Sequence, residues 1–379
     1  MTPVADAPGP AAVVGTRDHE HMQRALAIAE RGWGNTAPNP MVGAVVVAGG
    51  RVVGEGFHAR YGEVHAEVVA LRAAGEAARG ATMYVTLEPC AHHGKTPPCV
   101  DAVIAAGIAR IVIAVRDPSD IARGGVERLR GAGIAVDVGV ERDAALELNA
   151  PFFNAHGSDR PWVTLKLALS ADGGVADPTG RHRWITGASS RREVHRMRAS
   201  ADAVAVGIGT VLADDPSLTV REVDSPRVQP TRVVFDHDLR IPLTSMLVRT
   251  AREVPTVVIA AVGRESTPER GALVNAGVDV VPADSLGNAL VALRQRGVRS
   301  LFLEGGAKLA GAFLHDALVD RLTIFQSALV LGGEPLRAFG FAPAGFETSL
   351  ATYRIVEHRR FDEDVMTTYA LTAIPCSPD

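Results

Sequence analysis

The sequence carries its clearest structural information in His65-Ala66-Glu67 and in the longer run Thr86-Leu87-Glu88-Pro89-Cys90-Ala91-His92-His93-Gly94-Lys95-Thr96-Pro97-Pro98-Cys99. Three of these residues, His65, Cys90 and Cys99, are good ligands for zinc. A catalytic zinc site commonly has three protein ligands and keeps a fourth position for water. Glu67 follows His65 by two residues, so it can handle protons close to the metal without binding it. We therefore predict a hydrolytic zinc site in which Glu67 is the catalytic acid and base.

The spacing of these residues is close to H-x-E…P-C-x-x-C, the pattern of zinc-dependent nucleobase deaminases. Eight residues, instead of two, separate Cys90 from Cys99 in this chain. A site of this kind removes an amino group from an amidine-like ring carbon. The alternative is a structural zinc site with four protein ligands, in which His92 or His93 would supply the fourth.

The composition indicates a globular protein with two domains. A chain of 379 residues exceeds the size of one ordinary core, and a hydrophobic content of 47% is enough for two. A net charge of -4 and an aromatic content of 5% argue against a nucleic-acid-binding protein. No apolar run reaches about eighteen residues, so we expect no membrane association. The three cysteines indicate a reducing compartment, and we expect a cytoplasmic protein in which Cys376 is an idle thiol.

The chain is expected to divide near residue 160. Residues 1–16 contain many Ala, Pro and Gly residues and predict a disordered tail, followed by a first domain at 17–160 and a second at 161–379. The segment from Pro151 to Pro161 is polar, holds Gly157 and is flanked by prolines, which favours a linker.

Hydrophobic periodicity in the first domain predicts an α/β sandwich. Helices are expected at 22–29 with Gly32 as the C-cap, at 65–74, and at 99–106 with Gly107 as the cap. Strands are expected at 41–47, at 51–56 as the return strand of a hairpin, at 82–87 and at 110–115. Both groups of zinc ligands therefore lie at helix starts. The partial positive charge of a helix N-terminus favours the thiolate, which is the form that binds zinc.

The second domain is also predicted to be α/β, with a mostly parallel sheet. Its strands are expected at 162–169, 203–206, 232–235, 256–260, 278–281, 300–304 and 322–327. No G-x-G-x-x-G motif follows a strand with an acidic residue in the expected place, so an ordinary Rossmann site is not supported. Two other glycine turns follow strands, at 207–210 and at 305–311. Such turns can bind a phosphate where they open a helix, although packing turns look the same in a sequence.

Several motifs of the first domain together resemble the deaminase half of the bifunctional deaminase–reductase family of riboflavin biosynthesis. They are Pro38-Asn39-Pro40-Met41-Val42-Gly43, the two zinc-ligand motifs and Asp117-Pro118. The resemblance implies a cytidine-deaminase-like α/β/α sandwich that binds one Zn2+ and releases ammonia from a phosphoribosylated diaminopyrimidinone. It also implies that Asn39, His92 and Lys95 contact the substrate. The loop at 119–125 is shorter than the family's usual loop.

The second domain resembles the reductase half of the same family through Trp184-Ile185-Thr186, the segment 211–221 and Leu303-Glu304-Gly305-Gly306. The resemblance implies a dihydrofolate-reductase-like fold and NADPH-dependent reduction of the ribosyl group to a ribityl group. Lys166 would polarise the sugar oxygen as a second catalytic residue, and the alternative is an exposed strand lysine. The implied NADPH contacts are Ala168, Trp184, Thr210, Asp214, Gly306, Ala307, Lys308, Leu309, Ala310, Gly311 and Ala312. The implied substrate contacts are His182, Arg198, Leu218, Arg221 and Glu304, and both His182 and His237 replace a serine of the family.

Two other functions compete with this reading. A nucleobase or nucleic-acid zinc deaminase with an accessory domain would need a basic groove and aromatic platforms, which the composition does not favour. A scaffold that uses zinc only for folding would have no need of Glu67. We therefore expect a two-step enzyme that acts on a small phosphoribosylated pyrimidine, binds no nucleic acid and forms a homo-oligomer, a dimer.

Overall fold

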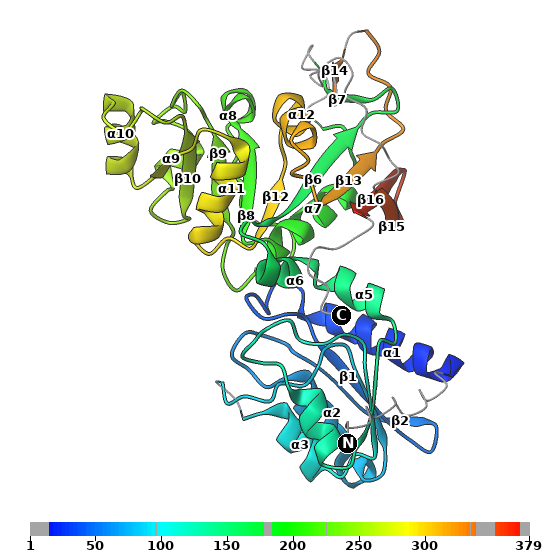
Figure 1. Ribbon diagram of the computed structural model, residues 1–379. Helices are drawn as coiled ribbons and strands as arrows, with labels where there is room; N and C mark the ends of the chain where they lie inside the picture. Colours follow the sequence, from blue (N-terminus) through cyan, green and yellow to red (C-terminus); the bar gives the residue numbers. More distant parts are fainter. Residues whose placement is uncertain are drawn as a thin grey trace, which may run out of the picture. The chain divides into compact units, whose positions relative to one another are not determined.

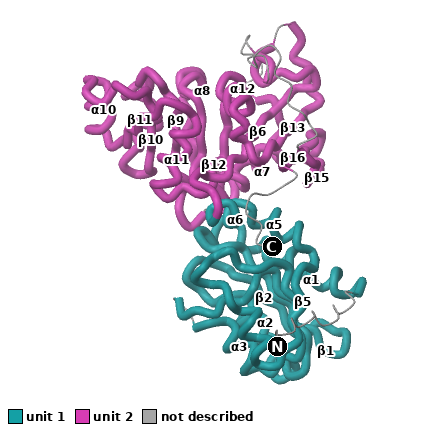
Figure 2. Tube along the Cα trace, viewed as in Figure 1, with its two compact units in different colours: residues 1–156, 376–379 teal, residues 157–375 magenta. Residues whose placement is uncertain are grey.

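The computed structural model describes residues 15–94, 97–177, 184–224, 226–333, 335–338 and 353–371. Lys95, His182 and Cys376 of the sequence predictions lie outside these residues, as do positions 1–14 of the predicted tail. The chain forms two compact units that divide between His156 and Gly157 (Figures 1 and 2). None of the helices among the described residues combines the length and the apolar character that a membrane crossing requires.

The first unit is built on a five-stranded sheet with the order β2-β1-β3-β4-β5. Strand β1 pairs antiparallel with both β2 and β3, whereas β3, β4 and β5 run parallel. The strands are β1 Gly43–Ala48, β2 Arg51–Phe57, β3 Thr82–Val85, β4 Arg110–Ile113 and β5 Ala135–Val138. The helices are α1 Thr16–Ala29, α2 Ala66–Ala74, α3 Cys99–Ala105, α4 Gly125–Gly131, α5 Arg142–Leu148 and α6 Ala150–Gly157, with short 3-10 turns η1 Glu30–Gly32 and η2 Gly75–Ala78.

Helices cover both faces of this sheet, so the predicted α/β/α sandwich is confirmed. Ala44 and Val46 of β1 share a core with the apolar sides of α2, α3 and α4. Gly43 faces the other way, and a Cβ atom there would clash with the Ala25 carbonyl of α1. On the first face, Gly54 and Gly56 of β2 leave no room for a side chain, because the backbone of α2 lies directly on them. Glycines on β2 thus bring α2, with His65 and Glu67 at its start, against the sheet.

The glycine turn predicted between the first two strands is confirmed, but the cap predicted at the end of the first helix is not. Gly49 and Gly50 have φ angles of 57° and 76° and join β1 to β2, as predicted. The prediction of Gly32 as the C-cap of the first helix is wrong, because the C-cap of α1 is Glu30 and the chain continues into η1. Gly32 is needed for space instead, since a Cβ atom there would lie 2.6 Å from the His58 carbonyl oxygen.

Asp18 in the first turn of α1 forms a partly buried ion pair with Arg110 of β4. Its carboxylate accepts hydrogen bonds from Arg110 Nη1 at 2.9 Å and Nη2 at 3.1 Å, and from Tyr84 Oη at 2.7 Å. The Arg110 hydrogen bonds outweigh the cost of burial and lower the pKa of Asp18 from 3.8 to about 2. The contribution of Asp18 to stability is therefore complete above about pH 5 and is lost as the pH falls from about 4 to 2.

We expect Asp18→Asn to lower the free energy of unfolding of the first unit by about 2 kcal/mol at pH 7. The loss should shrink as the pH falls toward 2, because the parent carboxyl is protonated first in the unfolded state and then in the folded state. Urea unfolding at pH 7 and pH 3 measures the difference. Asp143→Asn is the matched control, because the Asp143 side chain is 86% exposed. An equal loss at both pH values would show that the ion pair is not its source.

The second unit contains a nine-stranded sheet with the order β11-β10-β9-β8-β12-β6-β13-β16-β15 (Figure 1). All neighbours from β11 to β13 are parallel, and β16 and β15 complete the sheet in antiparallel pairing. These strands are β6 Trp162–Leu169, β8 Ala203–Gly207, β9 Thr231–Phe235, β10 Thr256–Ala260, β11 Asp279–Pro282, β12 Ser300–Leu303, β13 Arg321–Gln326, β15 Tyr353–Phe361 and β16 Asp364–Leu371. A small second sheet pairs β7 Gly174–Ala176 with β14 Leu336–Arg337. The mostly parallel sheet and its seven predicted strands are confirmed.

Helices also cover both faces of the large sheet. They are α7 Ala188–Ser200, α8 Ile208–Asp214, α9 Met246–Arg249, α10 Pro268–Ala276, α11 Leu286–Gln295 and α12 Ala307–His315. Residues of α11 and α12 pack with Leu165 and Leu167 of β6 in one core. Residues of α7, α9 and α10 pack with Val204 and Val206 of β8 in a second core. Two segments predicted without helix are helical: α6 runs through most of the expected linker, and α12 includes Ala307 to Ala312.

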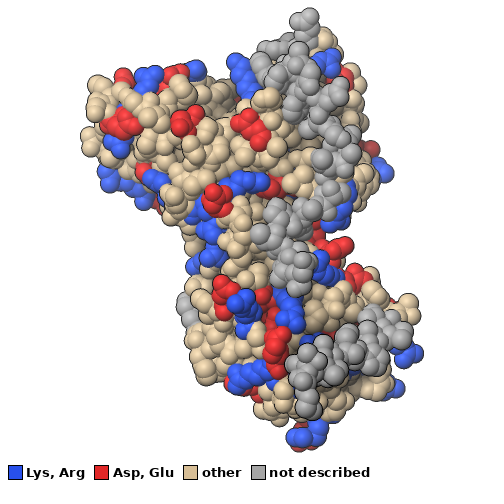
Figure 3. Space-filling model, in the orientation of Figure 1, with Lys and Arg blue, Asp and Glu red and all other residues tan. Residues whose placement is uncertain are grey.

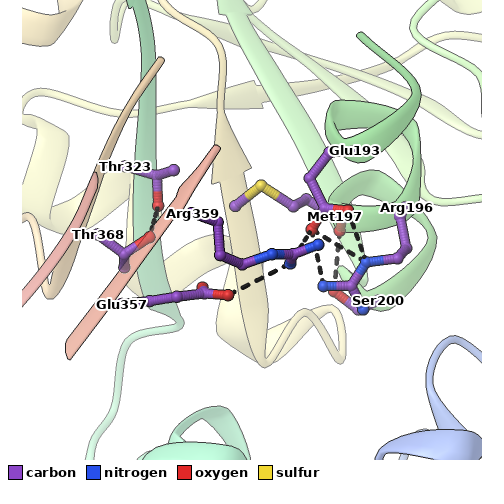
Figure 4. A network of polar contacts seen from close by, with 8 residues as sticks. All are labelled: Glu193, Arg196, Met197, Ser200, Thr323, Glu357, Arg359 and Thr368. Carbon is purple, nitrogen blue, oxygen red and sulfur yellow. Dashed lines mark hydrogen bonds and ion pairs between the residues drawn. The ribbon is translucent and has the colours of Figure 1, made fainter. Parts of the chain in front are cut away.

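A polar network ties α7 to the edge of the large sheet (Figure 4). Glu193 is buried and accepts hydrogen bonds from Arg196 on its own helix, at 2.7 Å, and from Arg359 on β15, at 3.3 Å. Thr323 and Thr368 join β13 to β16 through their hydroxyl groups at 3.2 Å. Because α7 carries Arg198 near its C-terminus, the network also holds one side of the candidate reductase site.

Candidate functional site

The three predicted zinc ligands converge in the first unit. His65 is the N-cap of α2, Cys90 follows β3, and Cys99 is the first residue of α3. Their ligand atoms all lie within 4.8 Å of one another. His65 Nδ1 faces both sulfur atoms, at 3.2 Å from Cys99 Sγ and 3.7 Å from Cys90 Sγ. One imidazole nitrogen and two sulfurs form a donor set that fits a zinc ion with an open fourth position, and neither His92 nor His93 belongs to the ligand group found among the described residues.

The two thiol groups of this cluster are hydrogen-bonded to each other. Hydrogen bonding from Cys99 and from His65 lowers the pKa of Cys90 to about 4, and the backbone N–H of Cys99 also donates to Cys90 Sγ at 3.4 Å. Cys99 donates its proton to Cys90, which raises its own pKa. Cys90 is therefore the more acidic of the two thiols, and both must be deprotonated when zinc binds.

Glu67 lies in the first turn of α2, two residues after the ligand His65. Its side chain is buried, with 3% of the residue exposed, and burial raises its pKa above the ordinary value for glutamate. A carboxyl group can both take up and release a proton during a reaction. The structure thus places a buried carboxyl group beside the three predicted zinc ligands.

The sequence interpretation missed Glu88, whose carboxylate stabilises the loop that packs against the zinc-ligand segment. The Glu88 carboxylate is buried and accepts hydrogen bonds from the backbone N–H groups of Asp117, Gly124 and Val126 at 3.2, 3.2 and 2.9 Å. These bonds hold the loop after β4 against the zinc-ligand segment. Ala122 of that loop packs against both Cys90 and Cys99. Glu88 precedes Pro89-Cys90 directly, which is the one sequence signal that could have indicated a role.

Two of the implied substrate contacts lie near the predicted zinc ligands. Asn39 is near them in space, through His58, and His92 is near them along the chain. Asn39 Nδ2 is 3.2 Å from Nε2 of the buried His58, and the His58 ring packs edge to face on His65 with centroids 5.3 Å apart. Burial lowers the pKa of His58, which favours its neutral form. His92 follows Cys90 by two residues, and its Nδ1 atom is buried without a hydrogen-bond partner in the described part of the chain.

In the second unit, Lys166, Arg198 and Glu304 form a charged cluster. Leu303 of β12 is in register with Leu165 of the parallel strand β6, so Glu304 follows on beside Lys166. Arg198 donates to both carboxylate oxygens of Glu304, with Nη2 to Oε2 at 3.0 Å, and to the Thr219 carbonyl at 3.1 Å.

The charged groups of this cluster shift one another's pKa values. Burial opposes the ionisation of Glu304, but Arg198 and Lys166 outweigh it and lower the Glu304 pKa. Burial lowers the pKa of Lys166, although the nearby Glu304 carboxylate acts to raise it. The alternative of an exposed strand lysine therefore does not fit Lys166. His195, which the sequence interpretation also missed, is buried beside Arg198 and Arg221, and burial together with these two cations lowers its pKa to about 4.

The two glycine turns of the second unit lie next to each other. Gly207 is the N-cap of α8 and Gly306 is the N-cap of α12, at the ends of the neighbouring strands β8 and β12. The Leu309 side chain lies against both Gly207 and Gly305. The glycine turn predicted at 305–311 is therefore corrected: it ends at Gly306, where α12 begins. Ala307, Ala310 and Gly311 are buried in that helix, whereas Gly306 and Lys308 are exposed.

The other implied contacts are more dispersed. Ala168 lies on β6, and Thr210 and Asp214 lie on α8, where Asp214 is exposed. Trp184 is 53% exposed and stacks under the Arg191 guanidinium at 5.0 Å. Leu218 is buried with a φ angle of 51°, and the backbone N–H of Arg221 donates to His195 Nδ1 at 3.3 Å. The structure therefore brings Arg221 toward the charged cluster through His195, whereas the contact described for Trp184 is with Arg191.

The fold and these sites together define a class of protein, a zinc-dependent deaminase joined to an NADPH-dependent reductase. Two family models match the chain: the cytidine and deoxycytidylate deaminase zinc-binding region at residues 16–115 and the RibD C-terminal domain at residues 161–367. The chain belongs to the RibD family of riboflavin biosynthesis proteins.

Similar proteins cover nearly all of this chain. The riboflavin biosynthesis protein RibD of Aquifex aeolicus is 45% identical over 318 residues, which are 83% of this chain and 88% of that protein. RibD of Escherichia coli is 42% identical over 335 residues, with 84% and 89% covered. A solved structure of Acinetobacter baumannii RibD has a TM-score of 0.80 at 37% identity and covers 94% of this chain and 99% of that one.

A Thermotoga maritima structure has a TM-score of 0.78 at 35% identity, with the same coverage of 94% and 99%. It is described as a diaminohydroxyphosphoribosylaminopyrimidine deaminase and 5-amino-6-(5-phosphoribosylamino)uracil reductase. The present chain is thus a bifunctional enzyme of riboflavin biosynthesis, with a cytidine-deaminase-like zinc domain followed by a dihydrofolate-reductase-like domain that uses NADPH. Its substrate is a small phosphoribosylated pyrimidine, and the alternative of a nucleic-acid base deaminase is not supported.

Proposed function

We propose that the first unit deaminates 2,5-diamino-6-(5-phosphoribosylamino)pyrimidin-4(3H)-one at the group formed by His65, Cys90 and Cys99. The observation that carries the proposal is the buried Glu67 carboxyl beside three converging zinc ligands. Water replaces the amino group on the ring carbon that it attacks, and ammonia leaves. When bound, zinc supplies Lewis acidity that makes water a better nucleophile near neutral pH.

In this reaction, Glu67 moves the protons. It accepts a proton from the attacking water and passes it to the unprotonated ring nitrogen; it then accepts the proton of the hydroxyl group on the tetrahedral carbon and passes it to the departing amino group, as the carbonyl forms. The raised pKa of Glu67 suits both steps, because the carboxyl must take up and give up a proton in each cycle. Asn39 binds the pyrimidine, while His92 and Lys95 bind the sugar phosphate, whose two negative charges favour a cation.

The second unit then reduces the ribosyl group at the cluster of Lys166, Arg198 and Glu304. NADPH supplies a hydride to the first carbon of the sugar when it is bound. Lys166 donates a hydrogen bond to the sugar oxygen as the ring opens, and the Arg198–Glu304 ion pair fixes the polar wall of the site. The turns at Gly207 and Gly306 allow the cofactor phosphates to approach backbone N–H groups at the start of a helix.

Domain limits, assembly and location belong to the same proposal. We assign residues 17–160 to the deaminase and 161–379 to the reductase. A homodimer is consistent with β15 at the edge of the described nine-stranded sheet, because an edge strand offers unpaired backbone groups. A cytoplasmic location suits the zinc site, since both ligand cysteines must remain reduced.

On the face in Figure 3, Lys and Arg side chains are interspersed with Asp and Glu, a distribution that does not favour binding to a nucleic-acid backbone.

Asp214→Ala tests the separation of the two sites. Asp214 ends α8, which begins at the Gly207 turn, and the loss of a charged hydrogen bond to the cofactor should raise the NADPH KM about ten- to a hundredfold. Ammonia release should not change, because Asp214 belongs to the other unit. Steady-state NADPH oxidation and ammonia release by the full chain measure both effects.

Asp215→Ala is the matched control for this substitution. Asp215 has a left-handed φ of 39° and accepts a hydrogen bond from the Met246 backbone N–H at 2.7 Å, so it forms the turn after α8. We expect Asp215→Ala to lower stability without a specific change in NADPH KM. An Asp214→Ala enzyme with the parent KM would remove Asp214 from the cofactor site.

A further inference from the structure

His58 connects three parts of the deaminase site. It follows β2, is only 2% exposed, and its backbone N–H donates to the Val42 carbonyl at 2.9 Å. Its ring nitrogen Nδ1 lies 3.3 Å from the Val64 carbonyl, next to the zinc ligand His65. Its other ring nitrogen, Nε2, lies 3.2 Å from Asn39 Nδ2. One buried imidazole thus contacts the segment before α2 and the loop that carries Asn39.

The hydrogen-bond partners fix the tautomer of His58. A carbonyl oxygen only accepts hydrogen bonds, so the proton must be on Nδ1, where it is donated to Val64. Nε2 of the neutral ring is then bare and can only accept. Asn39 must therefore turn its NH2 group toward His58, because its carbonyl oxygen would face a second acceptor. The orientation of the Asn39 amide follows from this network.

We propose that His58 is a positioning residue that fixes the Asn39 amide so that its Oδ1 atom is offered to the pyrimidine. This inference rests on the proposed deaminase function. Asn39 Oδ1 has no hydrogen-bond partner among the residues that the structure describes, so it is available to accept a proton donor of the substrate.

The chemistry of the substrate identifies that donor. In the proposed pyrimidinone, the reacting carbon lies between a ring N–H and an unprotonated ring nitrogen. Asn39 Oδ1 can accept from the ring N–H. A cytosine-type ring has a C–H in place of that N–H when its unprotonated nitrogen is turned to Glu67, so Oδ1 would be desolvated without a donor to accept from. His58 therefore helps to select the pyrimidinone against a cytosine-type ring.

A double-mutant cycle between the two residues tests the proposal. His58→Asn keeps a donor near the position of Nδ1 but loses the acceptor that faces Asn39, whereas His58→Gln can restore a group at the position of Nε2. We expect His58→Asn to lower the deaminase kcat/KM about tenfold and His58→Gln to recover most of that loss. In the Asn39→Ala background, His58→Asn should have almost no further effect, because its action passes through Asn39.

Zinc content and reduction of the already deaminated substrate serve as controls for folding in every variant. Additive effects of His58→Asn and Asn39→Ala would overturn the proposal. So would a loss of zinc in His58→Asn, because His58 would then act through Val64 and His65. If the parent enzyme releases no ammonia from the diaminopyrimidinone, the proposed function itself fails and this inference falls with it, which is a different outcome from an additive cycle in an active enzyme.

Discussion

Glu67→Gln is expected to abolish measurable ammonia release and to leave the zinc content unchanged. A general acid–base group contributes typically about 10²–10⁴-fold to a rate, and here one side chain serves several proton transfers, so the loss should reach at least that range. Glutamine has nearly the same shape as glutamate, which preserves the packing of this buried position at the start of α2. NADPH-dependent reduction of the deaminated substrate should be unaffected.

Ammonia release and zinc analysis on the same preparation decide the role of Glu67. Glu76→Gln is the matched control, because Glu76 is an exposed carboxylate in η2 of the same unit and should tolerate the change. A Glu67→Gln enzyme with full zinc and near-parent deamination would show that another group moves the protons.

Cys99→Ser should have the second largest effect, through loss of the metal. A hydroxyl replaces a thiolate in the ligand set, and an uncharged oxygen is a much poorer zinc ligand than a thiolate sulfur. Changes to the residues that support metal ligands already cost about 10–100-fold in metal affinity, so loss of a direct ligand should cost more than about 100-fold. Cys99 is also buried at the start of α3, and the first unit should unfold more easily without metal.

Metal analysis after dialysis and thermal unfolding measure these changes. Cys376→Ser makes the same chemical change at a cysteine outside the predicted site and should keep full zinc and full activity. Equal metal content in Cys99→Ser and the parent would contradict the assignment of His65, Cys90 and Cys99 as the ligand set.

Local pattern was enough to predict the zinc site and most of the two sheets. His65 and Cys99 both precede apolar positions with helical spacing, and the structure has both at the starts of helices. Strand β6 has the predicted limits, Trp162–Leu169, because its apolar residues alternate cleanly until Ser170. In these segments the local preferences and the tertiary environment favour the same structure.

Proline and glycine were misleading where they begin or end a helix. Pro151 and Gly157 suggested a linker, yet Pro151 lies in the first turn of α6, where its missing N–H is not needed, and Gly157 ends the helix. Gly306 and Gly311 suggested a loop, but Gly306 is the N-cap of α12 and Gly311 packs inside it. The edge strand β15 was not predicted, since Arg354, Glu357 and the arginines after it give no alternating apolar pattern.

Long-range partners explain the functional residues that the sequence did not reveal. Glu88 acts through backbone groups at 117–126, and His58 acts through Asn39 and Val64. His195 is identified only by its neighbours Arg198 and Arg221, which come together when α7 packs on the sheet. A single buried His or Glu looks like any other until the fold supplies its partners.

The stoichiometry of ammonia and NADPH in the full chain is the most direct test of an enzyme that deaminates first and reduces second. With the diaminopyrimidinone alone, the zinc-loaded enzyme should release ammonia, and NADPH added later should be oxidised in an amount equal to the ammonia already released. Removal of zinc with a chelator should stop both, whereas the chelated enzyme should still reduce the deaminated substrate. Oxidation of NADPH by the chelated enzyme with the diaminopyrimidinone, or ammonia release that zinc removal leaves unchanged, would contradict a zinc deaminase that feeds a reductase in one chain.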